Sequence, residues 1–338
     1  MYSKNNTSSI AEEFELKTKK EQRSERLSRI MPVIILIFLI LFFSITCPKS
    51  FPTIYNLKTI LNQLSITLII ALGITFVILT GSVDLSVDGV VALTGCLLSV
   101  LVLNSKYSTN LGLLAVLISL LVGMLCGLVS GIFLVKFKVS SFMVTYAMSA
   151  IAMGLALMSY GGLFATIKDP FLLSIPSTSL LGIPVITWIA FVVFVISYVI
   201  QEKTPFGRYM YAVGTNEAIP RMTGIKVDKV KIGVFMWSGA CLAIAGMISS
   251  LRLGYGIVDI GLGQYFPAQA AVVVGGTSLS GGRGGVVNTL VGAMIITVLE
   301  IGLLLLGVNT YIRTGVQGII IVIAVILSVH RTDRTICK

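Results

Sequence analysis

Charged residues are scarce in this chain of 338 amino acids, where Asp, Glu, Lys and Arg together make up 12% of the sequence. That shortage argues against an ordinary soluble domain, in which about a quarter of the residues are charged and roughly 45–50% are apolar. Here 56% are hydrophobic and the mean hydropathy is +0.98. The composition predicts a membrane protein with no room for a separate soluble domain.

The residue patterns of common catalytic, metal and nucleotide sites are also missing. The glycine-rich stretch GGTSLSGGRGG (275–285) lacks the Lys-Ser/Thr end of a phosphate-binding loop, so we expect no ATP binding by this chain itself. No H-E-x-x-H or G-x-S-x-G pattern occurs, and the five cysteines are scattered without a C-x-x-C pair. We therefore expect no catalytic residue, no metal site and no cofactor.

Long apolar runs fill the sequence from Met31 onward, and runs of about 20 residues are what a membrane core of ~30 Å requires of a helix. The polar stretch before them makes the first run an uncleaved span rather than a signal peptide. A further segment, 267–280, is apolar but short, and either re-enters or makes a short crossing. We expect an all-α polytopic bundle with spans near 31–47, 60–80, 86–103, 111–135, 139–160, 182–200, 232–251, 286–307 and 312–330.

The distribution of Lys and Arg predicts the orientation, because segments on the cytoplasmic side are rich in these residues. If 267–280 crosses, the chain makes ten crossings, and 19 of its 25 basic residues lie on the side of both termini. We therefore expect a cytoplasmic tail over 1–30, a transmembrane domain over 31–330 and a cytoplasmic tail over 331–338. The net charge of +11 lies between spans rather than on one face, which argues against nucleic-acid binding.

Two apolar runs are interrupted by glycine and serine. LTGSVDLS (79–86) and VGGTSLSG (274–281) share Leu-Ser, and aligning them on that pair places Gly81 on Gly275. Such breaks free backbone groups that lipid cannot satisfy, so they are tolerated only against protein or a water-filled path. We expect broken or re-entrant segments at both places.

Three carboxylates lie within apolar runs, at Asp84, Asp88 and Glu300. A charge near the membrane centre costs about 2.5–3.5 kcal/mol on insertion scales, so each should face a cavity, a partner or the membrane edge. Asp84 and Asp88 share one face if their segment is helical. Asp84 either lies on a translocation path or caps the next span, and both interpretations stay open. Glu300 is expected to line a cavity.

The longest segment between spans, 201–231, is expected on the cytoplasmic side. Thr215 or Asn216 could cap a short helix there with Glu217 in its first turn, or the helix could begin at Pro220. Gly224 suits the left-handed residue that ends a helix. Such a helix would form a protruding docking surface; the alternative is a plain basic connector.

The sequence FGRYMYAVGTNEAIPRMTGIKV (206–227), with ILTGSVDLSV before it and AVVVGGTSLSGGRGGVVNTLVGA after it, resembles the permease subunits of ribose-type ATP-binding cassette sugar importers. The resemblance implies a multi-pass protein of the plasma or inner membrane that imports a simple sugar. It implies four partners besides membrane lipid: a cytoplasmic ATP-binding subunit that holds the ATP, a second permease subunit in a homo- or heterodimer, an extracytoplasmic sugar-binding protein and the sugar.

Site residues follow from the resemblance position by position. The ATPase-coupling residues it implies are Gly207, Arg208, Gly214, Asn216, Glu217, Ala218, Arg221 and Gly224. The translocation path or gate it implies, together with the carboxylates above, comprises Gly81, Asp84, Leu85, Ser86, Asp88, Gly275, Gly276, Thr277, Ser278 and Glu300.

Two functions are compatible with these residues. The first is an importer permease driven by partner ATPases, in which the chain supplies shape and gating. The second is a proton-coupled secondary transporter, in which Asp84, Asp88 and Glu300 relay protons and a broken helix binds the substrate. The cytoplasmic segment and the extended resemblance favour the first.

Overall fold

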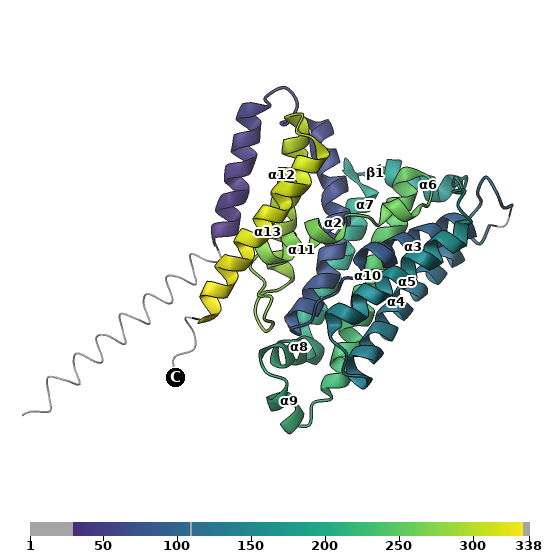
Figure 1. Cartoon of the computed structure of the whole chain (residues 1–338). Helices are drawn as coiled ribbons and strands as arrows, with labels where there is room; N and C mark the ends of the chain where they lie inside the picture. Colours follow the sequence, from purple (N-terminus) through teal and green to yellow (C-terminus); the bar gives the residue numbers. More distant parts are fainter. Residues whose placement is uncertain (1–29, 109, 334–338) are drawn as a thin grey trace, which may run out of the picture.

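The computed structural model describes residues 30–108 and 110–333, with side chains described as far as Val322, and it is predominantly α-helical (Figure 1). The tails expected over 1–30 and 331–338 therefore lie almost entirely outside the described residues. The long helices are Ile30–Thr46, α2 (Ile54–Leu79), α3 (Val87–Leu101), α4 (Leu113–Lys136), α5 (Ser141–Tyr160), α7 (Val185–Lys203), α10 (Val227–Leu253), α12 (Val286–Leu305) and α13 (Thr310–Asp333).

Shorter elements connect these helices. They are α6 (Pro170–Ser177), the strands β1 (Ser179–Leu180) and β2 (Ile183–Pro184), α8 (Pro205–Thr215), α9 (Ala218–Met222), the 3₁₀ turn η1 (Val258–Ile260) and α11 (Tyr265–Val274). The two strands pair as a small antiparallel hairpin just before α7.

Among the described residues, six helices are long and apolar enough to cross a membrane: α2, α4, α5, α7, α10 and α12. Ile30–Thr46 and α3 are apolar but shorter. Each of the nine predicted spans coincides with one helix. The largest difference is at α2, which begins at Ile54 because the Thr53 hydroxyl accepts the N–H of Asn56 and caps that end.

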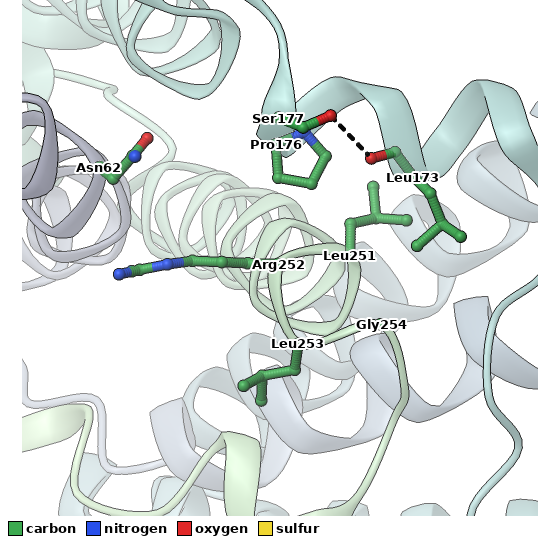
Figure 2. A pocket seen from close by; sticks show the side chains of 8 residues that line it. All are labelled: Asn62, Leu173, Pro176, Ser177, Leu251, Arg252, Leu253 and Gly254. Atoms are coloured by element: carbon green, nitrogen blue, oxygen red, sulfur yellow. Dashed lines mark hydrogen bonds between the residues drawn. The ribbon is translucent and has the colours of Figure 1, made fainter.

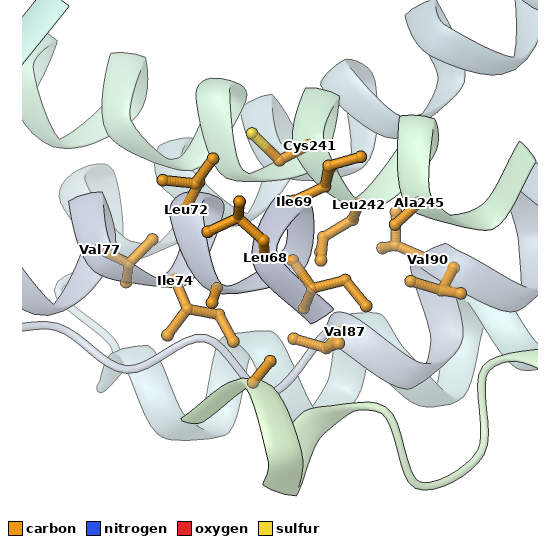
Figure 3. Packing of buried hydrophobic residues seen from close by; sticks show 14 of the residues in the cluster. Leu68, Ile69, Leu72, Ile74, Val77, Val87, Val90, Cys241, Leu242 and Ala245 are labelled. Atoms are coloured by element: carbon orange, nitrogen blue, oxygen red, sulfur yellow. The ribbon is translucent and has the colours of Figure 1, made fainter. Parts of the chain in front are cut away.

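The bundle is organised around α2 and α10, which lie in the middle of Figure 1 with α3, α4 and α5 to one side and α12 and α13 to the other. In the most apolar 18-residue stretch of each helix, 78% of the stretch is buried in α2 and 72% in α10. The corresponding share is 28% in each of α4, α5 and α7. Figure 3 shows how side chains of α2 such as Ile69 and Leu72 meet Cys241 and Leu242 of α10. The outer helices face lipid with one side, and α2 and α10 form the core.

Helix α4 packs against α10 through a row of glycines that sequence reasoning missed. A Cβ at Gly123 would lie 2.6 Å from the Gly239 carbonyl oxygen, and one at Gly127 would lie 2.1 Å from that of Phe235. Small residues at four-residue spacing let membrane helices approach closely. The repeat Gly123, Gly127, Gly131 is a signal from which this contact could have been predicted.

The first predicted break is an extended segment between α2 and α3. Helix α2 ends at Leu79, residues 82–86 form no helix, and α3 begins at Val87 inside the bundle. Asp84 contacts Ser238, which is near the middle of α10. The 15 residues of α3 are therefore preceded by extended backbone inside the bundle, and the expected break between two apolar runs is present.

The second break is longer than predicted. After α10, residues 255–264 run beside α3, with Gly256 against Cys96 and Gly261 against the backbone of Asp88, and only then does α11 begin. The ten residues of α11 extend about 15 Å, half the membrane core. The expected segment 267–280 thus contains a half-length helix preceded by mostly irregular backbone, and together they run from the end of α10 to the start of α12.

Candidate functional site

The Asp84 carboxylate is buried at the start of α3, where helical N–H groups have no partner within the helix. Its Oδ1 accepts from the Ser86 N–H at 2.9 Å and from the Ser86 hydroxyl at 2.6 Å. Its Oδ2 accepts from the Ser238 hydroxyl at 2.7 Å. Asp84 therefore stabilises the turn that leads into α3 and joins the extended segment to the central helix α10.

The Asp88 carboxylate performs the same task for the other half-helix. Its Oδ1 accepts from the N–H of Tyr265, the first residue of α11, at 2.9 Å, and its Oδ2 accepts from the N–H of Gly263 at 3.2 Å. A helix N-terminus carries partial positive charge, which favours a carboxylate there. Two helices that begin inside the bundle thus each receive one carboxylate.

The two aspartates do not share a helical face, because the condition for it is not met: Asp84 precedes α3 and only Asp88 belongs to that helix. Each carboxylate accepts from different donors, and Leu85 between them donates its N–H to the Thr145 hydroxyl of α5. The hydrogen bonds that each aspartate accepts take the place of the hydrogen bonds to water that a carboxylate loses on burial.

The two breaks end their preceding helices in the same way. The N–H of Ser82 donates to the Val77 carbonyl, and the N–H of Thr277 donates to the Val272 carbonyl, each across a glycine with positive φ. These bonds place Gly81 on Gly276, so the alignment of Gly81 with Gly275 is shifted by one residue. The two breaks therefore share a backbone geometry, in which Gly275 occupies the position of Thr80.

Both breaks contact α8 at one end of the bundle. The Gly282 N–H donates to the Leu79 carbonyl at 3.0 Å, which ties the glycine loop 275–285 to the end of α2. A Cβ at Gly214 of α8 would lie 1.8 Å from the Leu79 oxygen and 2.6 Å from the Gly282 nitrogen. A Cβ at Gly281 would lie 2.8 Å from the Gly81 nitrogen. We call this contact of Leu79, Gly81, Gly214, Gly281 and Gly282 the glycine junction.

Polar side chains hold the rest of the loop to α7 and α8. The Tyr211 hydroxyl donates to the Gly284 carbonyl at 2.7 Å, and the Val286 N–H donates to the Gln201 side chain at 2.8 Å. Burial, with a smaller effect from the charge of Glu202, raises the pKa of Tyr211 to about 12, so the phenol stays a donor at neutral pH. Thr277 accepts the Gly285 N–H. Sequence reasoning missed Tyr211 and Gln201, and no local pattern marks either residue.

Helix α9 lies beyond α8 at the lower edge of the view (Figure 1). It spans Ala218–Met222 and is preceded by an Asn216 side chain that accepts the Ala218 N–H at 2.9 Å. Of the two expected capping residues, Asn216 rather than Thr215 bonds to the start of α9, and the helix does not begin at Pro220. Gly224 adopts the left-handed conformation expected of it. The segment also contains α8, a second helix that was not predicted.

An ion cluster fixes α9 to the start of α10. Glu217 pairs with Lys231 and lies 3.8 Å from Arg221, which in turn pairs with Asp228 at 2.8 Å. The apolar side chains Ile219 and Met222 are 62% and 87% exposed. A five-residue helix that is ion-paired to its neighbours and presents two apolar side chains fits a protein-docking surface better than a plain connector.

The other predicted coupling residues lie in α8 or next to it. Gly207 packs so closely that a Cβ would lie 1.9 Å from the Gln201 carbonyl oxygen, whereas Arg208 is exposed. In the loop, the Ser278 N–H donates to the Arg283 carbonyl. The structure brings the coupling residues and the path residues Gly81 and 275–278 together at one end of the bundle, with Asp84, Leu85, Ser86 and Asp88 deeper inside.

Glu300 lies apart from that group, near the other end of α12. Its Oε2 is buried without a hydrogen-bond partner, and Arg252 and Arg313 are cations whose charges act on it. The Arg313 Nε is also buried and unpartnered. Within the described residues, no group of three or more His, Cys, Asp or Glu side chains is arranged to hold a metal ion.

Comparison with known proteins gives a match over most of the chain. Residues 56–325 match the family described as branched-chain amino acid transport system / permease component. The ribose import permease of Haemophilus influenzae is 40% identical over 299 residues, covering 87% of this chain and 90% of the relative. That of Bacillus subtilis is 38% identical, covering 94% and 97%.

A more distant relative carries a different sugar in its name. The L-arabinose ABC transporter permease of Azospirillum brasilense is 32% identical over 305 residues, covering 89% of this chain and 88% of the relative. No solved structure matches the chain.

Proposed function

Since the chain belongs to the branched-chain amino acid transport system / permease component family and groups there with ribose-type ATP-binding cassette permeases, we propose that it is the permease subunit of an importer for a simple sugar. The observation that carries the proposal is the near full-length match to sugar permeases. The family description names amino acids, but the relatives at 32–40% identity are named for ribose or arabinose. Ribose, another pentose, a hexose and a related polyol are the substrate class.

The orientation we propose puts α9 in the cytoplasm. Lys136 ends α4 and Lys138 follows it. The last turns of α4 pack against the first turns of α10 through Gly131 and Ile232, so these cations lie at the same end as α9 and Arg283. Ten crossings, two of them broken, then return both ends of the chain to that side. The ATP-binding subunit approaches this face, and the sugar-binding protein approaches the other.

In this proposal, movement of the ATPase is transmitted to the permease through α9. Ile219 and Met222 contact the ATPase, the ion cluster of Glu217, Arg221, Asp228 and Lys231 transmits its movement to α10, and α8 transmits it to the glycine junction. Because Gly214 leaves no space between α8 and Leu79, a shift of α8 must displace the ends of α2 and of the glycine loop. The half-helices α3 and α11 move with them, and a second permease subunit completes the path.

The test reverses the charge of Glu217 in the assembled transporter. Glu217→Arg places a cation between Arg221 and Lys231, which should release α9 and abolish ATP-dependent sugar uptake while the subunit remains inserted. Lys138→Glu is the matched control, because it reverses an exposed charge at the same end away from α9. Unchanged uptake together with unchanged ATPase assembly in Glu217→Arg would refute docking at α9.

A proton-coupled secondary transporter would require a different chemical property of the carboxylates. It needs carboxylates that titrate, and the buried, unpartnered Oε2 of Glu300 is the observation in its favour. Asp84 and Asp88, by contrast, already accept hydrogen bonds from half-helix ends. Reconstituted uptake should vanish without the ATPase and the binding protein; uptake driven by a proton gradient alone would establish the secondary transporter instead.

A further inference from the structure

A recess opens between α2, α6 and α10 at the end of the bundle opposite α9. It has a volume of about 410 Å³ and is lined by Asn62, Leu173, Pro176, Ser177, Leu251, Arg252, Leu253 and Gly254 (Figure 2). Asn62 lies in the early turns of α2, whose far end is at the glycine junction, and Arg252 lies in the last turn of α10, whose far end adjoins α9. In the orientation proposed above, the recess faces the extracytoplasmic side.

The polar groups of the recess converge from different helices. Figure 2 shows the Arg252 side chain extended across it toward Asn62. The Arg252 Nη1 donates to the Gln63 side chain at 3.1 Å, which holds the guanidinium at this edge, and the charge of Glu300 acts on Arg252 as well. The Asn62 Oδ1 is buried without a hydrogen-bond partner. A guanidinium and an amide therefore meet where one acceptor is unused.

Apolar side chains form part of the wall beside these polar groups. Leu173 and Pro176 of α6 face Leu251 of α10, and the Ser177 hydroxyl lies at the rim, where it donates to the Ser174 carbonyl. Ligand sites of roughly 300–1,000 Å³ combine apolar walls with a few convergent polar groups. A monosaccharide has this character, because its C–H faces suit apolar walls and its hydroxyl groups both donate and accept hydrogen bonds.

We propose that this recess is a receiving site for a monosaccharide or a related polyol, with Arg252 and Asn62 as its hydrogen-bonding residues. The inference rests on the proposed function, in that it assumes a sugar arrives on this side. It adds a binding site on the permease itself, separate from the glycine junction and from the partner that delivers the sugar. Weak, millimolar binding suits such a site, because the solute must leave it again.

The experiment measures protection of an introduced thiol in the assembled transporter in lipid nanodiscs. Ser177→Cys places a thiol at the rim, and a polar maleimide labels it; mass spectrometry of the peptide that carries it gives the rate apart from the native cysteines. D-ribose and L-arabinose should each slow labelling about threefold at twice the dissociation constant. Trimethylamine N-oxide at equal osmolarity should not. Leu163→Cys, in the exposed loop after α5, is the matched control and should be unprotected.

Two recess variants make the result specific. Asn62→Leu and, separately, Arg252→Met in the Ser177→Cys background should each remove protection, whereas Lys168→Met, which deletes an exposed charge in the loop before α6, should retain it. Unprotected labelling in the parent, or protection that survives both recess variants, would overturn the site. Protection that needs the sugar-binding protein but no sugar would also overturn it, because the recess would then be a protein contact.

The outcomes separate this site from the proposed function. Normal ATP-dependent sugar uptake without protection would reject the recess and leave the importer intact. Protection by D-ribose in a transporter that shows no ATP-dependent uptake would support the recess and reject the importer.

Discussion

A buried carboxylate in a membrane bundle stays charged only where other donors replace water, and at Asp84 these donors are Ser86 and Ser238. Sequence reasoning left Asp84 between a path residue and a cap. The structure gives Asp84 hydrogen bonds to the turn before α3 and to α10, while Ser86 is the N-cap residue of α3; a place for Asp84 on the path stays a prediction. The same holds for Asp88, whose donors lie on residues 263 and 265, far along the sequence.

Asp84→Ala should destabilise the permease by about 2–3 kcal/mol, because it leaves the Ser86 N–H and the Ser238 hydroxyl without their acceptor. Asp84→Asn should cost far less, since the amide oxygen can still accept from Ser86 and the amide nitrogen can donate to Ser238. The thermal unfolding midpoint of the purified protein and sugar uptake both measure this. A proton relay predicts an equally stable Asp84→Asn protein that no longer transports.

Ser238→Ala provides the partner for a double-mutant cycle. If Ser238 acts through Asp84, the cost of removing both side chains should be less than the sum of the two single costs. Additive effects would show that the hydroxyl and the carboxylate contribute independently.

At the scale of elements, hydropathy located the long helices well, because a helix in lipid must be apolar over its whole length. Hydropathy did not predict the segments whose conformation depends on tertiary contacts. Residues 255–264 leave helical geometry beside α3, and the N–H groups of Gly263 and Tyr265 are satisfied by Asp88, more than 170 residues earlier. Helix α8 was missed because it is short and contains two glycines, and its position depends on contacts with α2 and the glycine loop.

Gly214→Ala tests the contact between α8 and the glycine junction. A Cβ there would lie 1.8 Å from the Leu79 carbonyl oxygen, and that oxygen belongs to backbone that cannot rotate away. The helix must therefore separate from α2 and the loop, and we expect loss of most ATP-driven uptake, about tenfold or more for a displacement that costs 1–3 kcal/mol. Uptake in vesicles with matched protein levels is the measurement.

Gly154→Ala is the control for that substitution. Gly154 is a helical glycine of α5 with nothing within 4 Å of the added Cβ, so the same chemical change should be tolerated. Wild-type uptake in Gly214→Ala would mean that α8 shifts freely and does not transmit movement to the breaks.

At the scale of the whole molecule, the distribution of Lys and Arg predicts which end of the bundle is cytoplasmic. What the structure adds is that distant basic segments converge. Arg283, Lys136 and the segment around α9 share one end although more than 140 residues separate the first two. The side of the membrane follows from the positive-inside rule.

Cysteine accessibility in intact cells measures the orientation directly. Met222→Cys on α9 and Leu163→Cys after α5 replace side chains that are 87% and 72% exposed, so neither should disturb the fold. A membrane-impermeant maleimide should label Leu163→Cys from outside and should label Met222→Cys only after the membrane is opened. Because α9 and the α5–α6 loop lie at opposite ends of α10, identical labelling of both from outside would contradict the bundle itself. Reversed labelling would instead be compatible with the bundle but would place α9 on the outer surface, where no ATPase reaches it. The proposed coupling route through Glu217, α8 and the glycine junction would then be refuted.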